Sequence, residues 1–321
     1  MRWFLWASLL FVSCQVVAAE AESFASLSMG YRLDALDWNI NGAGNSPGSE
    51  PNILSELEWR DMDIFQLKAE LVGANKAGFY FRGSAAYGRT FDGVNQDSDY
   101  AGDNRSLEFS RSLSDIDGSS VTDLSAGLGY VFYLGVNEDI RFIPLLGVSY
   151  NRQDLRMSNG NQILWDSANA AVYDPSSVGS PLLGPFPGLD ASYDANWWGS
   201  WAGVDVLMDL QDGSNVYARV ELHQAFYLAR ANWNLRDDFA HPVSFEHKAD
   251  GMGWVLELGW RQPPSRYFWT WGATVSLQSW ATDSGTDRTY LANNTYVEGR
   301  LNEVNWSSRS INLILSKVFT D

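Results

Sequence analysis

Two acidic residues in a short polar segment are the first candidates for chemistry. Asp97 and Asp99 lie two residues apart in the segment 95–100, which reads NQDSDY. Two carboxylates at this spacing could face each other and polarise a water molecule. They could also bind calcium, but the helix–loop–helix calcium motif needs glycine where Tyr100 stands and a glutamate at its last ligand position. A solvated acidic loop explains the same pattern, so the spacing alone leaves both interpretations open.

A second candidate lies in the segment 236–247, which reads RDDFAHPVSFEH and contains two of the three histidines. A histidine with a carboxylate partner can act as a general base, because the acid fixes the tautomer and orientation of the ring. Asp238 and His241 are the candidate pair. An aspartate near a histidine in a loop is also typical of an ordinary surface segment.

The chain around these segments alternates with the period of a β-strand. The segment 64–71 reads IFQLKAEL, in which the odd-numbered residues are apolar and most even-numbered residues are polar. Alternation of this kind places one face of each strand against lipid and the other in a lumen. Ten candidate strands span residues 23–36, 53–73, 78–91, 120–134, 140–156, 196–209, 215–232, 251–261, 267–281 and 304–319.

The connections between these strands alternate between short and long. Tight turns are predicted at 74–77, 135–139, 210–214 and 262–266, and long connections at 37–52, 92–119, 157–195, 233–250 and 282–303. Outer-membrane barrels have this layout, with the short turns in the periplasm. The second and fourth long connections hold the two candidate pairs. In a ten-stranded barrel they lie on opposite sides of the mouth and could flank one cleft.

The predicted fold is therefore all-β, a ten-stranded antiparallel transmembrane β-barrel with long extracellular loops. The apolar phase should gather beside the short turns, as it does in 79–87, 216–222, 254–260 and 267–277. A soluble β-sandwich or lipocalin-like barrel would also alternate. It would not explain the tryptophans on the apolar phase, which suit a membrane interface, or the sorted connection lengths.

Residues 1–19 read as a secretory signal peptide, with a basic start, a short apolar run and small residues before the expected cleavage after Ala19 or, alternatively, Ala21. Cys14 is the only cysteine and would leave with the signal, unless it anchors a lipoprotein. Residues 20–321 are then the outer-membrane barrel of a Gram-negative-type bacterium. The net charge of −17 argues against a nucleic-acid partner, which needs a basic surface.

The lumen is expected to be filled rather than open, because small barrels pack their interior and porins use sixteen or more strands. Glu56, Glu58, Arg60, Lys68 and Glu70 alternate along one strand and are predicted to share one face. Arg219, Glu221 and His223 do the same on another strand. We interpret them as a structural network of ion pairs and hydrogen bonds. A small pore remains the other interpretation.

The topology and the sequence DSDY at 97–100 resemble the omptins, outer-membrane endopeptidases with a ten-stranded projecting barrel. This resemblance implies that Asp97 and Asp99 form the catalytic carboxylate pair and that Asp238 and His241 form the dyad. The omptin dyad has one residue between its members, whereas Phe239 and Ala240 both intervene here. The resemblance also implies a cationic peptide substrate.

Four segments resemble a neighbouring group more closely, the omptin-like barrels named after a protochlamydial outer-membrane protein. They are FRG at 81–83, NQDSDY at 95–100, ANWNLR at 231–236 and FEH at 245–247. This resemblance implies the fold and the location but no activity. The leading hypothesis is a structural or surface-interaction role, and the alternative is an omptin-type endopeptidase that cleaves cationic peptides. No cofactor or metal site is predicted. The expected partner is outer-membrane lipid, with lipopolysaccharide as the candidate bound lipid.

Overall fold

The computed structural model describes residues 23–42, 50–175 and 183–319. The signal segment 1–19 and its cleavage site lie outside the described residues. No helix among these residues is long and apolar enough to cross a membrane.

Most of the described chain is antiparallel strand. The elements are β1 (Ser23–Ile40), β2 (Ser55–Ala74), β3 (Phe79–Gly102), β4 (Ser106–Asp115), β5 (Ser120–Tyr130), β6 (Phe132–Leu134), β7 (Ile140–Trp165), α1 (Ser167–Tyr173), β8 (Gly184–Pro185), β9 (Asp190–Asp209), β10 (Asn215–Asn232), β11 (Phe245–Arg261), β12 (Trp269–Thr282), β13 (Gly285–Tyr290) and β14 (Tyr296–Phe319).

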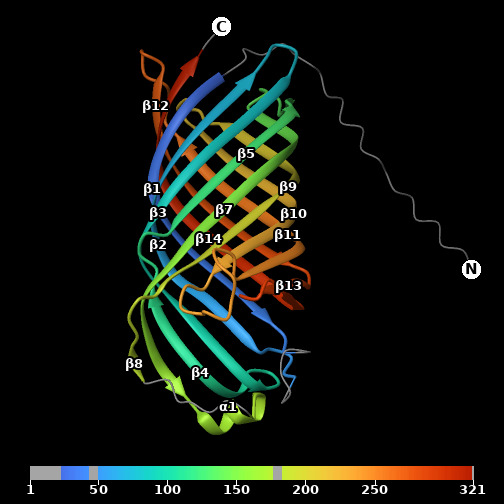
Figure 1. The fold of residues 1–321 in the computed structure, drawn as a ribbon. Helices are drawn as coiled ribbons and strands as arrows, with labels where there is room; N and C mark the ends of the chain where they lie inside the picture. Colours follow the sequence, from blue (N-terminus) through green and yellow to red (C-terminus); the bar gives the residue numbers. More distant parts are fainter. Residues whose placement is uncertain (1–22, 43–49, 176–182, 320–321) are drawn as a thin grey trace, which may run out of the picture.

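These strands close into one barrel (Figure 1). The first and last strands, β1 and β14, pair along the whole length of β1, from Ser23↔Phe319 to Ile40↔Leu301. Strands β5 and β4 follow each other between β3 and β7, and β12 and β13 follow each other between β11 and β14. Within the described residues the ring therefore has ten strand positions, which confirms the predicted fold.

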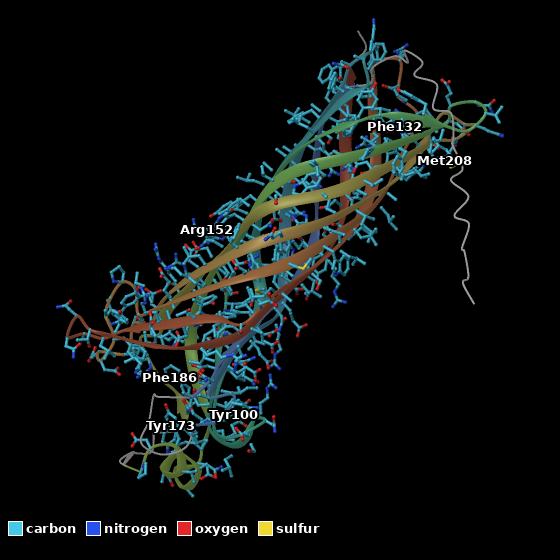
Figure 2. The ribbon with its side chains drawn as sticks, turned by 90° about the vertical axis from the view of Figure 1, so that its right-hand side faces the viewer. Tyr100, Phe132, Arg152, Tyr173, Phe186 and Met208 are labelled. Atoms are coloured by element: carbon cyan, nitrogen blue, oxygen red, sulfur yellow. The ribbon has the colours of Figure 1, made fainter. Side chains whose placement is uncertain are left out.

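The two ends of the barrel differ in the way the sequence predicted. Short connections at 75–78, 135–139, 210–214 and 262–268 gather at the upper end in Figure 1. Strands β4 and β8 and helix α1 lie at the lower end. Figure 2 shows the same polarity, with Phe132 and Met208 near one end and Tyr100, Tyr173 and Phe186 near the other. The first end is the periplasmic one and the second is extracellular.

Much of the predicted loop sequence is strand instead. Strand β3 continues to Gly102, β4 pairs with it, β7 continues to Trp165, and β11, β13 and β14 take up parts of the last two long connections. Above the bilayer both faces of a strand can be polar, so the alternation that marks a strand disappears although the backbone pairing does not. Asp97 and Asp99 consequently lie on a strand rather than in a loop.

The outer wall carries an apolar belt beside the short turns. Side chains that alternate along the strands are half exposed there, as predicted, while their neighbours are buried. Leu222 is 61% exposed and His223 3%, and Leu313 is 64% exposed and Asn312 4%. Because the exposed side chains of this belt are apolar and the buried ones are polar, the outer wall is suited to contact with lipid hydrocarbon and not with water.

A β-bulge on β2 changes which of its side chains face the interior. On β2, Arg60 and Asp61 lie opposite the single residue Ala35 of β1, and Asp61 has φ 51°. The extra residue reverses the phase of the strand. Leu57 and Trp59 therefore point inward and are buried, and Glu58 and Arg60 lie on the opposite face from Lys68 and Glu70. The prediction that Glu56, Glu58, Arg60, Lys68 and Glu70 share one face is wrong.

Candidate functional site

The candidate acidic pair lies on the inner face of the projecting part of the barrel. Asp97 pairs with Leu57 on β2 and with Ser112 on β4, and Asp99 occupies the next inward position. Because Leu57 is buried inside the barrel, its cross-strand neighbour Asp97 also points inward. A second register shift, near Asp92 of β3, matches the bulge on β2. Without these two bulges the odd-numbered carboxylates would face outward like Phe79 and Phe81.

The pKa values of both carboxyl groups are raised above the ordinary value of an aspartate. Burial raises the pKa of Asp97 well above its usual range, and the neighbouring charge of Asp99 raises it further. Burial raises the pKa of Asp99 to about 6, against the lowering effect of hydrogen bonds from Ser55 and Ser110 and of the Arg236 charge. The titrations of two neighbouring carboxyls depend on each other, because the charge of one makes ionisation of the other less favourable. The pair can therefore change charge near neutral pH.

A loop from the opposite wall supplies the cation that faces this pair. Arg236 Nε and Nη2 each donate a hydrogen bond to Asp238 at 2.8 Å, and the guanidinium lies 4.0 Å from the centre of the Phe239 ring. The charges of Asp99 and Asp97 add to that of Asp238 in raising the pKa of Arg236. The structure thus brings the second and fourth extracellular connections together, as the topology predicted, with Arg236 between them.

The predicted dyad is not formed in this structure. His241 Nδ1 lies 2.7 Å from Asn232 Oδ1, and the carboxylate of Asp238 is occupied by Arg236. Among the described residues, no hydrogen bond or ion pair joins Asp238 to His241. The hydrogen bonds from the Arg236 side chain lower the pKa of Asp238, so Asp238 remains an anion whose partner is Arg236. A catalytic role for these four residues stays a prediction.

Another histidine has the partners that His241 lacks, but it is buried. His247 Nδ1 lies 2.9 Å from the Tyr193 hydroxyl, and His247 Nε2 lies 3.3 Å from Asp287 Oδ1. The ring is fully buried and packs at 4.7 Å from Trp38. Asp287 lies on β13, forty residues further along the chain, so no local pattern could have revealed the pair. Without access to solvent, this arrangement can support the wall but cannot reach a substrate.

Below the mouth, an aromatic layer fills the lumen. Trp197 lies 6.1 Å from Trp306 and 4.4 Å from Tyr227, and Trp306 stacks on Trp280 at 5.4 Å. Trp59 and Tyr193 stack on each other at 5.1 Å, nearer to the mouth. All belong to one cluster of buried side chains that come from every side of the barrel. A second buried cluster, which includes Tyr80, Trp201 and Tyr217, fills the periplasmic end.

A charged network occupies the space between these two clusters. Arg219 Nη1 lies 2.7 Å from Glu70 and 2.8 Å from Glu257, and Lys68 Nζ lies 2.8 Å from Glu257. Arg32, Arg82 and His223 extend it through Asp34, Asp123, Asp205 and Glu221. The ion pairs that the sequence predicted for the lumen are therefore present along β2 and β10. A cavity of about 110 Å³ remains beside it, which is room for a few water molecules.

Comparison with known proteins places this chain among outer-membrane barrels. The family model of the Protochlamydia outer membrane protein matches residues 26–319. The search of curated proteins finds no match. The crystal structure of outer membrane protease OmpT from Escherichia coli is similar at a TM-score of 0.68 and 10% identity, over 93% of this chain and 97% of that one.

Two further structures match over similar lengths but at low TM-scores. The outer membrane protein OprG from Pseudomonas aeruginosa gives 0.32 at 11% identity, with 94% of this chain and 98% of that chain covered. The translocator domain of autotransporter NalP from Neisseria meningitidis gives 0.35 at 9% identity, with 94% and 89% covered. Of these three structures, OmpT alone has a TM-score high enough to support a shared fold. At identities of 9–11% none of them supports a shared activity.

Proposed function

The chain belongs to the Protochlamydia outer membrane protein family and is an outer-membrane β-barrel, and from this premise we propose that it is a closed barrel that presents its projecting mouth to a partner at the cell surface. The filled lumen is the observation that carries the proposal. A solute would have to pass the aromatic layer, the charged network and the periplasmic cluster in turn. Such a barrel serves as a rigid support for what it displays.

The mouth indicates the chemistry of that partner. Asp97 and Asp99 face inward, and the positive charge that acts on them across the mouth is that of the chain's own Arg236, whose hydrogen bonds go to Asp238. A partner that presents arginine or lysine side chains can replace Arg236 and gain charge-assisted hydrogen bonds. The proposed partner is therefore a cationic peptide or a basic protein segment.

Binding of an arginine-rich peptide to the detergent-solubilised protein tests this proposal. Loss of a hydrogen bond to a charged group costs about 1.5–3 kcal/mol, so a variant with both Asp97→Asn and Asp99→Asn should bind about tenfold or more weakly. Asp92→Asn, on the same strand but exposed, is the matched control and should bind like the natural protein. Equal affinities for the two variants would contradict the assignment of the mouth. Ion conduction through planar bilayers would contradict the closed lumen.

The second candidate function is an omptin-type endopeptidase. What favours it is that the carboxylate pair and the segment with Asp238 and His241 approach one another across one mouth. What it requires is that Asp238 exchange its partner Arg236 for His241, which now contacts Asn232. An arriving cationic substrate could release that carboxylate by taking the place of Arg236.

A cleavage assay separates the two functions. The protein is refolded in detergent with lipopolysaccharide and given a pool of basic peptides. The endopeptidase predicts cleavage that disappears in His241→Ala and Asp97→Ala. Binding without cleavage, or cleavage that survives His241→Ala, removes the enzyme and leaves the surface role.

Lipopolysaccharide is the proposed lipid partner at the outer leaflet. Arg152 shares the outward phase of Leu146 and Val148 but lies further from the short turns, midway along the barrel in Figure 2. It pairs with Asp194 at the surface, and Arg230 pairs with Glu246 at 2.9 Å. A lipid phosphate would compete with these carboxylates for the arginines. Stabilisation by lipopolysaccharide that is reduced in Arg152→Gln with Arg230→Gln supports this partner, and unchanged stabilisation argues against it.

A further inference from the structure

The lipid-facing wall has an apolar groove beside the periplasmic rim. It crosses β14, β1, β2 and β3, and its volume is about 630 Å³, within the range of small-molecule sites. Small side chains at Ala25, Ala69 and Ala85 form its floor, and Leu27 and Leu71, each more than half exposed, rise beside them. The pairings Leu27↔Ala69 and Ala69↔Ala85 place these residues on adjacent strands in one outward row. The depression is therefore a feature of the wall itself and not of a loop.

One basic side chain stands at the edge of this groove. Lys317 lines the groove, donates a hydrogen bond to the carbonyl oxygen of Tyr267 at 2.5 Å, and lies 5.5 Å from the ring centre of Trp269. Within the residues that the structure describes, its partners are this carbonyl and two aromatic rings, and no carboxylate pairs with it. A lysine held among interfacial aromatics sits at the depth of lipid headgroups.

Among the periplasmic turns that the structure describes, basic and acidic residues lie on different sides of the barrel, and the groove adjoins the basic side. The turns that adjoin the groove carry Lys76 and Arg266, and Arg266 lies 4.6 Å from the ring centre of Tyr267. The two turns on the far side of the barrel carry acidic residues instead, Glu138 and Asp139 in one and Asp212 in the other. In a protein with net charge −17, three basic residues near one groove are a local exception.

We propose that this groove binds one anionic glycerophospholipid of the periplasmic leaflet, with an acyl chain over Ala69 and Ala85 and the headgroup phosphate at Lys317. The two parts of the groove match the two parts of such a lipid. An apolar trough at the hydrocarbon level receives a chain, and a cation at the headgroup level receives a phosphate. Because the site faces the periplasmic leaflet, its lipid differs from the lipopolysaccharide proposed for the outer leaflet.

Native mass spectrometry of the whole protein in detergent tests this site. Phosphatidylglycerol and phosphatidylcholine with identical chains are added in turn, and the bound lipids per barrel are counted. A basic residue near a lipid headgroup contributes about 1 kcal/mol, so the natural protein should prefer phosphatidylglycerol by about fivefold. Lys317→Gln should bring that preference close to one while the chain still binds. Arg309→Gln, an exposed residue on the same strand at the other edge of the belt, is the matched control and should leave the preference unchanged.

A second pair of variants tests the trough independently of charge. Ala69→Phe with Ala85→Phe fills the groove and should abolish retention of both lipids, whereas Ala218→Phe, on the opposite wall, should not. Heat-modifiable gel mobility checks that each variant has folded. The proposal is overturned if the filled variant retains phosphatidylglycerol as the natural protein does, or if Arg309→Gln lowers the preference as much as Lys317→Gln.

Discussion

The carboxyl pair at the mouth should make the protein less stable as the pH rises from about 4 to about 6. Burial raises the pKa of Asp99 from 3.8 to about 6 in the folded protein. In that pH window the folded state binds more protons than the unfolded state, so the free energy of unfolding falls with increasing pH. The penalty is fully present above pH 6 and absent below the unfolded pKa. Asp99→Asn should therefore stabilise the protein at pH 8 and leave it unchanged at pH 4.

The size of this effect follows from the shift. Two pKa units correspond to about 3 kcal/mol, which is an upper value because the carboxyl keeps partial contact with water. We expect a gain of about 1–2 kcal/mol at pH 8 in Asp99→Asn. The tryptophans make intrinsic fluorescence a direct reporter of urea unfolding in detergent micelles. Unfolding is measured at pH 4, 6 and 8.

Asp92→Asn is the control for this experiment. Asp92 is exposed on the same strand and should show no gain at any pH. The reasoning would be refuted if Asp99→Asn lost stability at pH 8, or if both variants gained equally at pH 4 and pH 8. In the first case the ionised carboxylate would be stabilising through Arg236, and in the second the gain would come from net charge alone.

Three further predictions concern the lumen and the seam. Trp59→Ala empties a fully buried site in the aromatic layer and should cost about 3–5 kcal/mol, visible as a lower temperature of the heat-modifiable mobility shift. Arg219→Met removes the cation that Glu70 and Glu257 share and leaves Glu257 to Lys68 and Glu70 to the longer contact with Arg261. It should cost up to about 3–5 kcal/mol in urea unfolding, whereas Arg60→Met at an exposed ion pair should cost at most about 1 kcal/mol. Gly30→Ala places a methyl group 2.1 Å from the carbonyl oxygen of Ile311 across the β1–β14 seam, so refolding yield should fall sharply on the same gels; normal yield would mean that the seam can widen.

Much of the fold was readable from the sequence because a membrane imposes one simple rule. Lipid on one side and a packed lumen on the other force alternate residues to differ, which exposed Leu222 and buried His223 as predicted. The glycine, asparagine and aspartate residues of the tight turns likewise predicted where those turns lie. Outside the bilayer the outer face of a strand need not be apolar, so the alternation is lost. The sequence therefore predicts a loop for the part of β3 that carries Asp97 and Asp99.

The candidate site was predicted only in part. The topology correctly brought the second and fourth connections to one mouth. It could not show that Arg236 would take Asp238 and leave His241 to Asn232, because those choices depend on the path of a loop that no period governs. It also could not show that His247 would meet Asp287 from another strand.

The sequence alone determined the membrane wall, the number of strand positions and the end of the barrel that carries long connections, because each follows from a local period or turn. Only the tertiary structure decided which residues share the interior. One extra residue at Asp61, and a matching shift near Asp92, reverse the faces of two strands and turn Asp97 and Asp99 inward. The stacked layers of the lumen and the groove at Lys317 likewise exist only where strands distant in sequence lie side by side.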